Sequence, residues 1–249
     1  MIDDLRRRLE TRPPGVSDRF SPDDVLYDPD GIEHYMRSAD VALRHIRLAL
    51  LTADNPKVGA ALDFACGYGR VLRMLRAEYP DARIVACDVD RKAVDFCAEA
   101  FDAEPVYSDP DPDRIAIKGP FDLIWSGSFF THIGADDWER FLHLLASLLS
   151  PGGVLVFTTA GRHVVELMRK GELARLSESS ARALLDDYEQ GGFGFAEYPG
   201  RSGYGLSRAT PAWVSGLVAR IPGLRLVGYA EAPGATGTRQ DFVSCVRAA

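Results

Sequence analysis

The segment Leu62-Asp-Phe-Ala-Cys-Gly-Tyr-Gly-Arg70 joins a short apolar run to a helical pattern through a turn that contains two glycines. The apolar run begins at Val58, and the residues after the turn place Val71, Leu72 and Leu75 on one side of a helix. The order strand, tight loop, helix is the opening unit of an α/β fold. The sequence therefore predicts a buried strand at about 58–64, followed by a tight loop and a helix.

The same alternation continues toward the C-terminus. Because parallel neighbouring strands need crossover connections, alternating strands and helices indicate a mostly parallel sheet with helices on both faces. We therefore expect a doubly wound, seven-stranded α/β sheet whose last two strands, near 224–231 and 241–247, form an antiparallel hairpin at its edge. The other predicted elements are strands at 83–88, 104–107, 121–125 and 154–157, and helices over 91–101 and 136–149.

The chain has 249 residues, of which 46% are hydrophobic and 26% charged, a balance typical of globular proteins. Residues 1–57 are predicted to form an N-terminal arm and a helix, because prolines interrupt the beginning and apolar residues then recur with helical spacing from Ile32 to Leu50. Residues 58–249 form the main domain, with an insertion at about 161–210. The glycine-rich, aromatic segment 191–205 within it is expected to be a long irregular binding loop.

Charge and composition exclude several classes of function. A net charge of -7 argues against general binding to nucleic acid or to anionic membranes, because such binding depends on Lys and Arg. No apolar run is long enough to span a membrane or resembles a signal peptide, so a cytoplasmic location is expected. The four cysteines form no CxxC pair and are predicted to be reduced, and the histidine spacings predict no metal site.

The loop after the first strand contains acids as well as glycines. Gly67 and Gly69 begin a dinucleotide fingerprint but Leu72 replaces its third glycine, and Asp63 beside the loop would repel a pyrophosphate. A ligand with an ammonium and a sulfonium group would instead be attracted by that carboxylate, and the glycines would let the backbone approach it. Asp88 ends the next strand, where an acid can accept hydrogen bonds from ribose hydroxyls.

Segment 62–70 resembles the first motif of the class I, Rossmann-like S-adenosylmethionine-dependent methyltransferases. The resemblance covers about 58–160 and the closing hairpin, and it implies S-adenosylmethionine as the cofactor. It implies that Asp63, Ala65 and Gly67 surround the methionine part, that Asp88 holds the ribose, and that Val89 and Asp109 meet the adenine. Gly69 is a further cofactor-binding candidate, and Trp125 or Ser126 would flank the methionine or the sulfonium. Further segments similar to the family are 86–90, 108–109, 121–132, 151–153 and 240–242.

Several of these residues also have a purely structural interpretation. Asp88 and Asp90 are candidates for helix caps, Asp90 more so, and Asp109 lies in a turn where an Asx interaction would explain it. His132 follows the fourth strand and is our candidate general base, although it could instead cap a helix or bind backbone. The acceptor is predicted to contact a set of aromatic side chains: Tyr35, Phe129, Phe130, Phe193, Phe195 and Tyr204.

The predicted function is methyl transfer to a small-molecule acceptor of the sugar or secondary-metabolite type, with neither nucleic acid nor membrane as partner. Two alternatives stay open. One is a catalytically silent, methyltransferase-like binding partner, and the other is an NAD(P)-dependent oxidoreductase, for which the glycine fingerprint is incomplete. The sequence does not give the acceptor atom or the oligomeric state.

Overall fold

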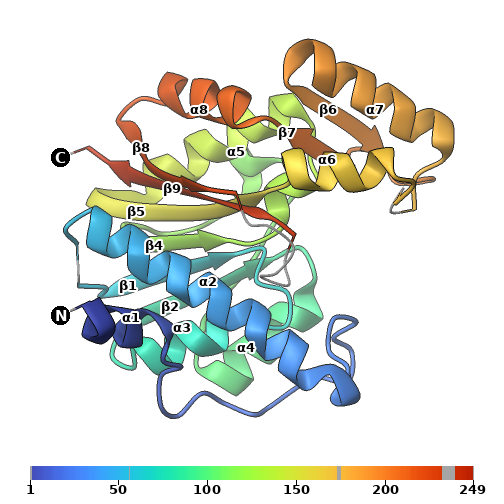
Figure 1. Cartoon of the computed structure of the whole chain (residues 1–249). Helices are drawn as coiled ribbons and strands as arrows, with labels where there is room; N and C mark the ends of the chain where they lie inside the picture. The colour runs from blue at the N-terminus through green and yellow to red at the C-terminus, as the bar shows by residue number, and fades with distance from the viewer. Residues whose placement is uncertain (1, 56, 173–174, 232–238, 249) are drawn as a thin grey trace.

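A seven-stranded sheet forms the centre of the molecule (Figure 1). The computed structural model describes residues 2–55, 57–172, 175–231 and 239–248, and its strand order is β3-β2-β1-β4-β5-β9-β8. The strands of this sheet are β1 (Ala60–Phe64), β2 (Arg83–Asp88), β3 (Glu104–Tyr107), β4 (Phe121–Ser126), β5 (Leu149–Thr159), β8 (Leu224–Ala230) and β9 (Asp241–Arg247).

Strands β1 to β5 are parallel, whereas β9 runs antiparallel to both β5 and β8. The predicted doubly wound sheet with an antiparallel C-terminal hairpin is therefore confirmed. The strand order reverses direction at the β1–β4 boundary. In open α/β sheets, ligands bind outside the carboxyl ends of the strands at such a switch point.

Helices cover both faces of the sheet and enclose two apolar cores. The core on one side packs around α5 (Ala135–Leu148) and α8 (Pro211–Arg220), with Trp138 fully buried. The other core packs against α2 (Ile32–Thr52), α3 (Leu72–Glu78) and α4 (Arg91–Phe101). The carboxylate of Asp90 accepts hydrogen bonds from the first amides of α4, which confirms it as a helix cap.

The N-terminal region, α1 (Ile2–Glu10) and the segment through η1 (Pro29–Gly31), packs against the main domain. The buried guanidinium of Arg73 donates a 3.1 Å hydrogen bond to the Ser17 carbonyl and lies 4.2 Å from the centre of the Phe20 ring. The hydroxyl of Tyr35 donates to the Asp24 carboxylate at 2.7 Å. These contacts hold residues 17–27 as a wall beside α2.

Residues 161–210 project beside β5 and contain α6 (Arg162–Arg169), α7 (Glu178–Gly191) and a separate antiparallel pair, β6 (Phe193–Glu197) and β7 (Gly205–Ala209) (Figure 1). The prediction of a long irregular loop at 191–205 is therefore wrong. Some of its glycines permit close packing: a Cβ on Gly194 would lie 2.0 Å from the Leu184 carbonyl oxygen of α7. Only the turn between β6 and β7 is irregular.

Two short 3₁₀ turns complete the loops at the carboxyl ends, η2 (Pro112–Arg114) and η3 (Phe129–Thr131). In the described part of the chain, no helix combines the length and the apolar character that a bilayer crossing requires.

Candidate active site

A cavity of about 800 Å³ opens at the carboxyl ends of the parallel strands. Its first half, the strand-end half, is formed by residues 63–68, 88–90 and 108–110, which follow β1, β2 and β3. Its second half, the hairpin half, is formed by one face of α2, the segment after β4 and the β6–β7 turn. This volume is typical of small-molecule sites.

Asp63 lies at the base of the strand-end half, on β1 between Ala86 of β2 and Trp125 of β4. Its side chain is 1% exposed, and neither carboxylate oxygen has a hydrogen bond of ordinary geometry from the described residues. Burial, and then the nearby charge of Asp88, raise the pKa of Asp63 to about 8, while Arg70 and the Leu72 amide oppose this weakly. An unpartnered buried carboxylate facing a cavity indicates a site for a cationic group.

The loop after β1 turns sharply because Ala65 and Gly67 both have positive φ values, 64° and 50°. The Ala65 amide donates to the Cys87 carbonyl at 2.8 Å, which fixes the turn to β2. No atom lies within 4 Å of the position that a Cβ on Gly67 would occupy, so the backbone there faces open space. A ligand can therefore approach the main chain closely at Gly67.

Gly69, which the resemblance places near the cofactor, does not line the cavity. A Cβ there would lie 2.5 Å from the Phe101 ring and 2.9 Å from the Cys97 sulfur. This glycine lets the loop pack closely against α4 and shapes the site from behind. The cysteines are all buried and free, and the Cys97 thiol donates to the Gly67 carbonyl at 3.3 Å.

Asp88 ties the first two loops of the strand-end half together. One carboxylate oxygen accepts a 2.8 Å hydrogen bond from the Gly67 amide, and the other accepts one of 2.9 Å from the Asp90 amide. Asp88 also lines the cavity, and each oxygen retains a further lone pair for a ligand hydroxyl. Its neighbour Val89 is 66% exposed, an apolar surface at the mouth of the cavity.

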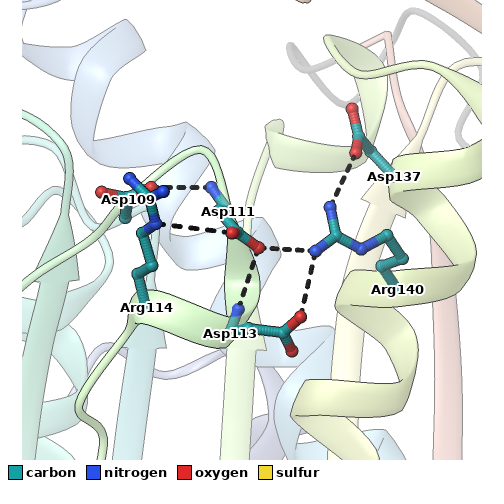
Figure 2. Close-up of polar contacts among 6 residues, drawn as sticks. All are labelled: Asp109, Asp111, Asp113, Arg114, Asp137 and Arg140. Carbon is teal, nitrogen blue, oxygen red and sulfur yellow. Dashed lines mark hydrogen bonds and ion pairs between the residues drawn. The ribbon is translucent and has the colours of Figure 1, made fainter.

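Asp109 lines the third edge of the strand-end half. Its carboxylate accepts a 2.8 Å hydrogen bond from the Asp111 amide, so the expected Asx turn is present as well. Figure 2 shows how this turn is anchored: Arg140 of α5 contacts Asp111, Asp113 and Asp137. The guanidinium of Arg140 lowers the pKa of Asp111 and holds the loop in place.

Trp125 and Ser126 end β4, and only Trp125 lines the cavity. Successive strand side chains point to opposite faces, and Ser126 is fully buried without a hydrogen-bond partner for its hydroxyl among the described residues. The Trp125 ring packs on Phe242 at 6.1 Å, and Phe242 stacks on His45 of α2 at 3.9 Å. Of the two predicted residues, the structure brings Trp125 to the site and leaves Ser126 outside it.

His132 lies in the hairpin half, just after η3. Its Nδ1 lies 2.7 Å from the Gly205 carbonyl oxygen, and its ring packs against Tyr204 with ring centres 5.0 Å apart. Burial lowers the pKa of His132 below its ordinary value. His132 thus makes the backbone hydrogen bond expected of a structural role, and its ring also lines the cavity, as a general base would require.

The six aromatic residues predicted to contact an acceptor divide into two sets. Tyr35, Phe129 and Tyr204 line the hairpin half. The prediction is wrong for the other three, which lie outside the cavity lining: Phe130 is buried against Trp138 and Phe157, Phe193 stacks on Trp213 at 4.4 Å, and Phe195 lines a separate, shallow depression with Gly134. Strand formation in 193–197 turns Phe193 into the core next to α5 and α8.

Several lining residues are missed by the sequence reasoning. Asp24 and Leu26 come from the N-terminal segment, and no pattern in that proline-rich stretch marks them. Ser38 and Ala42 lie on the same face of α2 as Tyr35. Their helical spacing from Tyr35 could have predicted that they also line the cavity. Thr158 and Gln240 also line the hairpin half, where the Gln240 amide donates to the Ser128 hydroxyl at 2.9 Å.

Known methyltransferases are similar in sequence to part of this chain. A family model described as a methyltransferase domain matches residues 62–155. A malonyl-[acyl-carrier protein] O-methyltransferase of Acetivibrio thermocellus is 28% identical over 143 residues, 57% of this chain and 48% of that protein. A dTDP-4-amino-2,3,4,6-tetradeoxy-D-glucose N,N-dimethyltransferase of Saccharopolyspora spinosa is 27% identical over 151 residues, 57% of this chain and 59% of that protein. The chain thus matches about half the length of these relatives.

Solved structures share the fold. An S-adenosylmethionine-dependent methyltransferase from Clostridium acetobutylicum aligns with a TM-score of 0.57 at 13% identity, over 86% of this chain and 92% of that one. A magnesium protoporphyrin IX methyltransferase from Synechocystis, solved with bound S-adenosylhomocysteine, aligns with a TM-score of 0.55 at 14% identity, over 99% of this chain and 94% of that one. Residues 62–155 thus match a methyltransferase domain, and the chain shares the fold of solved S-adenosylmethionine-dependent methyltransferases.

Proposed function

We propose that this protein binds S-adenosylmethionine in the strand-end half of the cavity and transfers its methyl group to a small molecule in the hairpin half. One observation supports this more than any other: Asp63 is buried, has no hydrogen bond of ordinary geometry from the described residues, and lines the cavity. When bound, S-adenosylmethionine supplies a methyl group from a sulfonium, whose sulfur keeps the electron pair of the broken bond.

The residues of the strand-end half fit this cofactor. Asp63 offers a carboxylate to a cationic group, and Asp88 offers acceptor oxygens to the ribose hydroxyls. Val89 offers an exposed apolar side chain to the adenine, and Asp109 a carboxylate to its amino group. Ala65 and Gly67 supply backbone around the amino-acid part.

Arg70 adds a cation that the sequence reasoning left without a role. It lines the cavity, and its guanidinium carbon lies 5.5 Å from the centre of the Tyr35 ring. We propose that its guanidinium binds the carboxylate of the cofactor's amino-acid part. Asp63 and Arg70 would then distinguish the two ends of a zwitterion.

The carboxylates of Asp63 and Asp88 disfavour the binding of a nicotinamide dinucleotide. Its pyrophosphate carries two negative charges and would have to lie close to Asp63 and Asp88. The oxidoreductase alternative therefore has no support in the site.

The acceptor we propose is uncharged or bears an amine, of the sugar or secondary-metabolite type. Six aspartates line the cavity, against the single guanidinium of Arg70 among its Lys and Arg residues. Residues outside the described ranges carry no charged side chains, so none of them adds a cation. Like charges inside a low-dielectric cavity repel, so a carboxylate or phosphate group on the acceptor is disfavoured. Tyr35, Phe129 and Tyr204 provide ring faces for an apolar body or an ammonium.

We further propose that His132 takes up the proton released by the acceptor. The bond that forms joins the acceptor heteroatom to the methyl carbon, and its proton passes to the ring nitrogen of His132 that faces the cavity. Burial keeps this imidazole neutral at physiological pH, the state that a general base requires. The remaining contribution of the protein is alignment and exclusion of water.

Native mass spectrometry of the purified protein, followed by a transfer assay, tests this function. The protein is incubated with S-adenosylmethionine carrying a labelled methyl group and with matched acceptors that differ only in bearing an amine, a hydroxyl or a carboxylate. We expect S-adenosylhomocysteine to form and the label to reach amine or hydroxyl acceptors. Retention of a nicotinamide nucleotide would contradict the cofactor, and labelling of carboxylates alone would contradict the acceptor class.

A further inference from the structure

The β6–β7 hairpin is bonded directly to the turn that holds His132. The Gly205 amide donates to the His132 carbonyl at 3.0 Å, and the His132 ring returns a 2.7 Å contact from Nδ1 to the Gly205 carbonyl. Two residues along β7, the buried hydroxyl of Ser207 donates to the Phe130 carbonyl at 2.7 Å. Three hydrogen bonds thus join β7 to residues 130–132.

A backbone carbonyl can only accept a hydrogen bond, so the nitrogen facing Gly205 must carry the proton. In a neutral imidazole the lone pair then lies on Nε2. No described residue makes a hydrogen bond to Nε2, and the ring lines the cavity. We infer that the hairpin locks His132 in the Nδ1-protonated tautomer, with Gly205 as the positioning residue that directs a bare Nε2 toward the acceptor. The role in catalysis rests on the proposed function, whereas the tautomer does not.

Only glycine allows this arrangement at position 205. A Cβ there would lie 2.0 Å from the Ala196 carbonyl oxygen and 2.6 Å from the Glu197 Cα, both backbone atoms of β6. Any side chain would force the two strands apart and displace the Gly205 carbonyl from the ring of His132. Tyr204 packs on that ring at an interplanar angle of 26°, which limits its rotation.

The groups around the ring favour its neutral form. Arg208 of β7 lies near His132 and disfavours a second positive charge, and the hydroxyl-bearing rings of Tyr198 and Tyr204 are uncharged at neutral pH. Asp137 of α5 lines the same cavity, but Arg140 lies beside it and offsets its charge. Burial contributes most to the lowered pKa of His132, and the hydrogen bond to the Gly205 carbonyl opposes it. The hairpin therefore determines which nitrogen is protonated, and burial keeps the second nitrogen unprotonated.

Nuclear magnetic resonance of the ligand-free protein tests this directly. Protein with ¹⁵N-labelled histidine is recorded by two-bond nitrogen–proton correlation between pH 7 and 8, and His132 is assigned from the signals missing in His132→Asn. We expect a protonated Nδ1 and a bare Nε2 throughout. Free histidine in water prefers the opposite tautomer, so this result would not arise by default. A protonated Nε2 or an imidazolium at pH 7 would overturn the inference.

Three further variants test the part played by the hairpin. Ser207→Ala removes the hydroxyl that joins β7 to Phe130, Ser207→Thr keeps it, and Ser215→Ala removes a similar hydroxyl-to-carbonyl bond within α8 as a control. We expect Ser207→Ala to mix the two tautomers, and the other two variants to behave like the parent protein. An unchanged tautomer in Ser207→Ala would refute the hairpin's role.

Calorimetric titration with S-adenosylhomocysteine, run on the same samples, separates this inference from the proposed function. Ser207→Ala should bind it within about twofold of the parent, because the hydrogen bond that it loses lies outside the strand-end half. Absence of binding in every sample would reject the proposed function and leave the tautomer assignment standing. A loss of binding confined to Ser207→Ala would show general disruption and would overturn the positioning role.

Discussion

The two halves of the cavity are built in different ways. The strand-end half takes its polar groups from loops that follow three adjacent parallel strands, β1, β2 and β3, within or next to the matched region 62–155. The hairpin half combines segments that are far apart in the chain, from Asp24 to Gln240. The sheet topology alone brings the first set together, whereas the second set depends on how helices and the hairpin pack. We therefore expect cofactor binding and acceptor chemistry to respond to separate substitutions.

The largest expected effect is in the hairpin half. His132→Asn should reduce turnover about 100-fold or more, the usual contribution of a general base, and leave the affinity for S-adenosylhomocysteine within about twofold. Turnover is measured with an acceptor identified by the label-transfer assay, and His143→Asn, at an exposed position of α5, serves as control. Equal small losses in turnover and affinity would remove His132 from the mechanism.

The second largest effect is expected in the strand-end half, and it concerns cofactor affinity instead of turnover. Asp88→Ala should weaken S-adenosylhomocysteine binding about 100-fold, because each hydrogen bond to an ionised group contributes about 1.5–3 kcal/mol. Calorimetry measures this affinity, and Asp95→Ala, which removes an exposed carboxylate bonded to the Tyr107 hydroxyl, is the matched control. If Asp88→Ala bound normally but failed to turn over, the assignment of the two halves would be reversed.

Asp63 gives the strand-end half a distinct pH dependence. Its pKa is about 4 in an unfolded chain and about 8 in the fold, so between these values the unfolded chain binds fewer protons. The free energy of unfolding of the ligand-free protein should therefore fall as pH rises from about 4 to about 8, by on the order of a few kcal/mol. Denaturant titrations at pH 5 and pH 8.5 compare the parent with Asp63→Asn.

In Asp63→Asn this contribution is absent, and the variant should be the more stable of the two at pH 8.5. Identical pH profiles for both proteins would mean that the Asp63 carboxylate is solvated or paired, and that no cation-binding group lies at the base of the cavity.

The smallest effect concerns the support of Asp109 rather than a ligand contact. Arg140→Ala releases the turn shown in Figure 2 and should weaken S-adenosylhomocysteine binding about two- to threefold, in line with exposed ion pairs. Turnover at saturating cofactor should not change. Arg169→Ala, which breaks an exposed pair with Glu189, provides the baseline. A large loss of turnover in Arg140→Ala would connect this cluster to the hairpin half instead.

The sequence predicts the strand-end half well because its signals are local. The order of strand, glycine loop and acid fixes the positions of Asp63, Gly67 and Asp88, and parallel topology then brings their loops to one edge. Ser126, the alternative to Trp125 in the prediction, does not line the cavity. Side chains alternate along β4, so Trp125 faces the cavity and Ser126 points to the other face of the sheet.

The hairpin half was less predictable because glycine and aromatic residues have two opposite uses. In 191–205 they resemble a mobile loop, yet Gly194 and Gly205 permit close backbone contacts and Phe193 fills the core. Asp24 reaches the site through the packing of Arg73 on Phe20 and through its own bond to Tyr35. Such long-range contacts have no periodic signature in the sequence.

Calorimetric titration of the parent protein and Asp63→Asn with S-adenosylmethionine and, separately, with NAD tests the central claim most directly. At pH 7, in two buffers of different ionisation heat, the parent should bind S-adenosylmethionine with release of a proton, because a cation beside Asp63 lowers its raised pKa. Asp63→Asn should bind more weakly without that release, and NAD should give no binding heat with either protein. Tight binding of NAD, or S-adenosylmethionine binding that is identical in both proteins, would contradict the account.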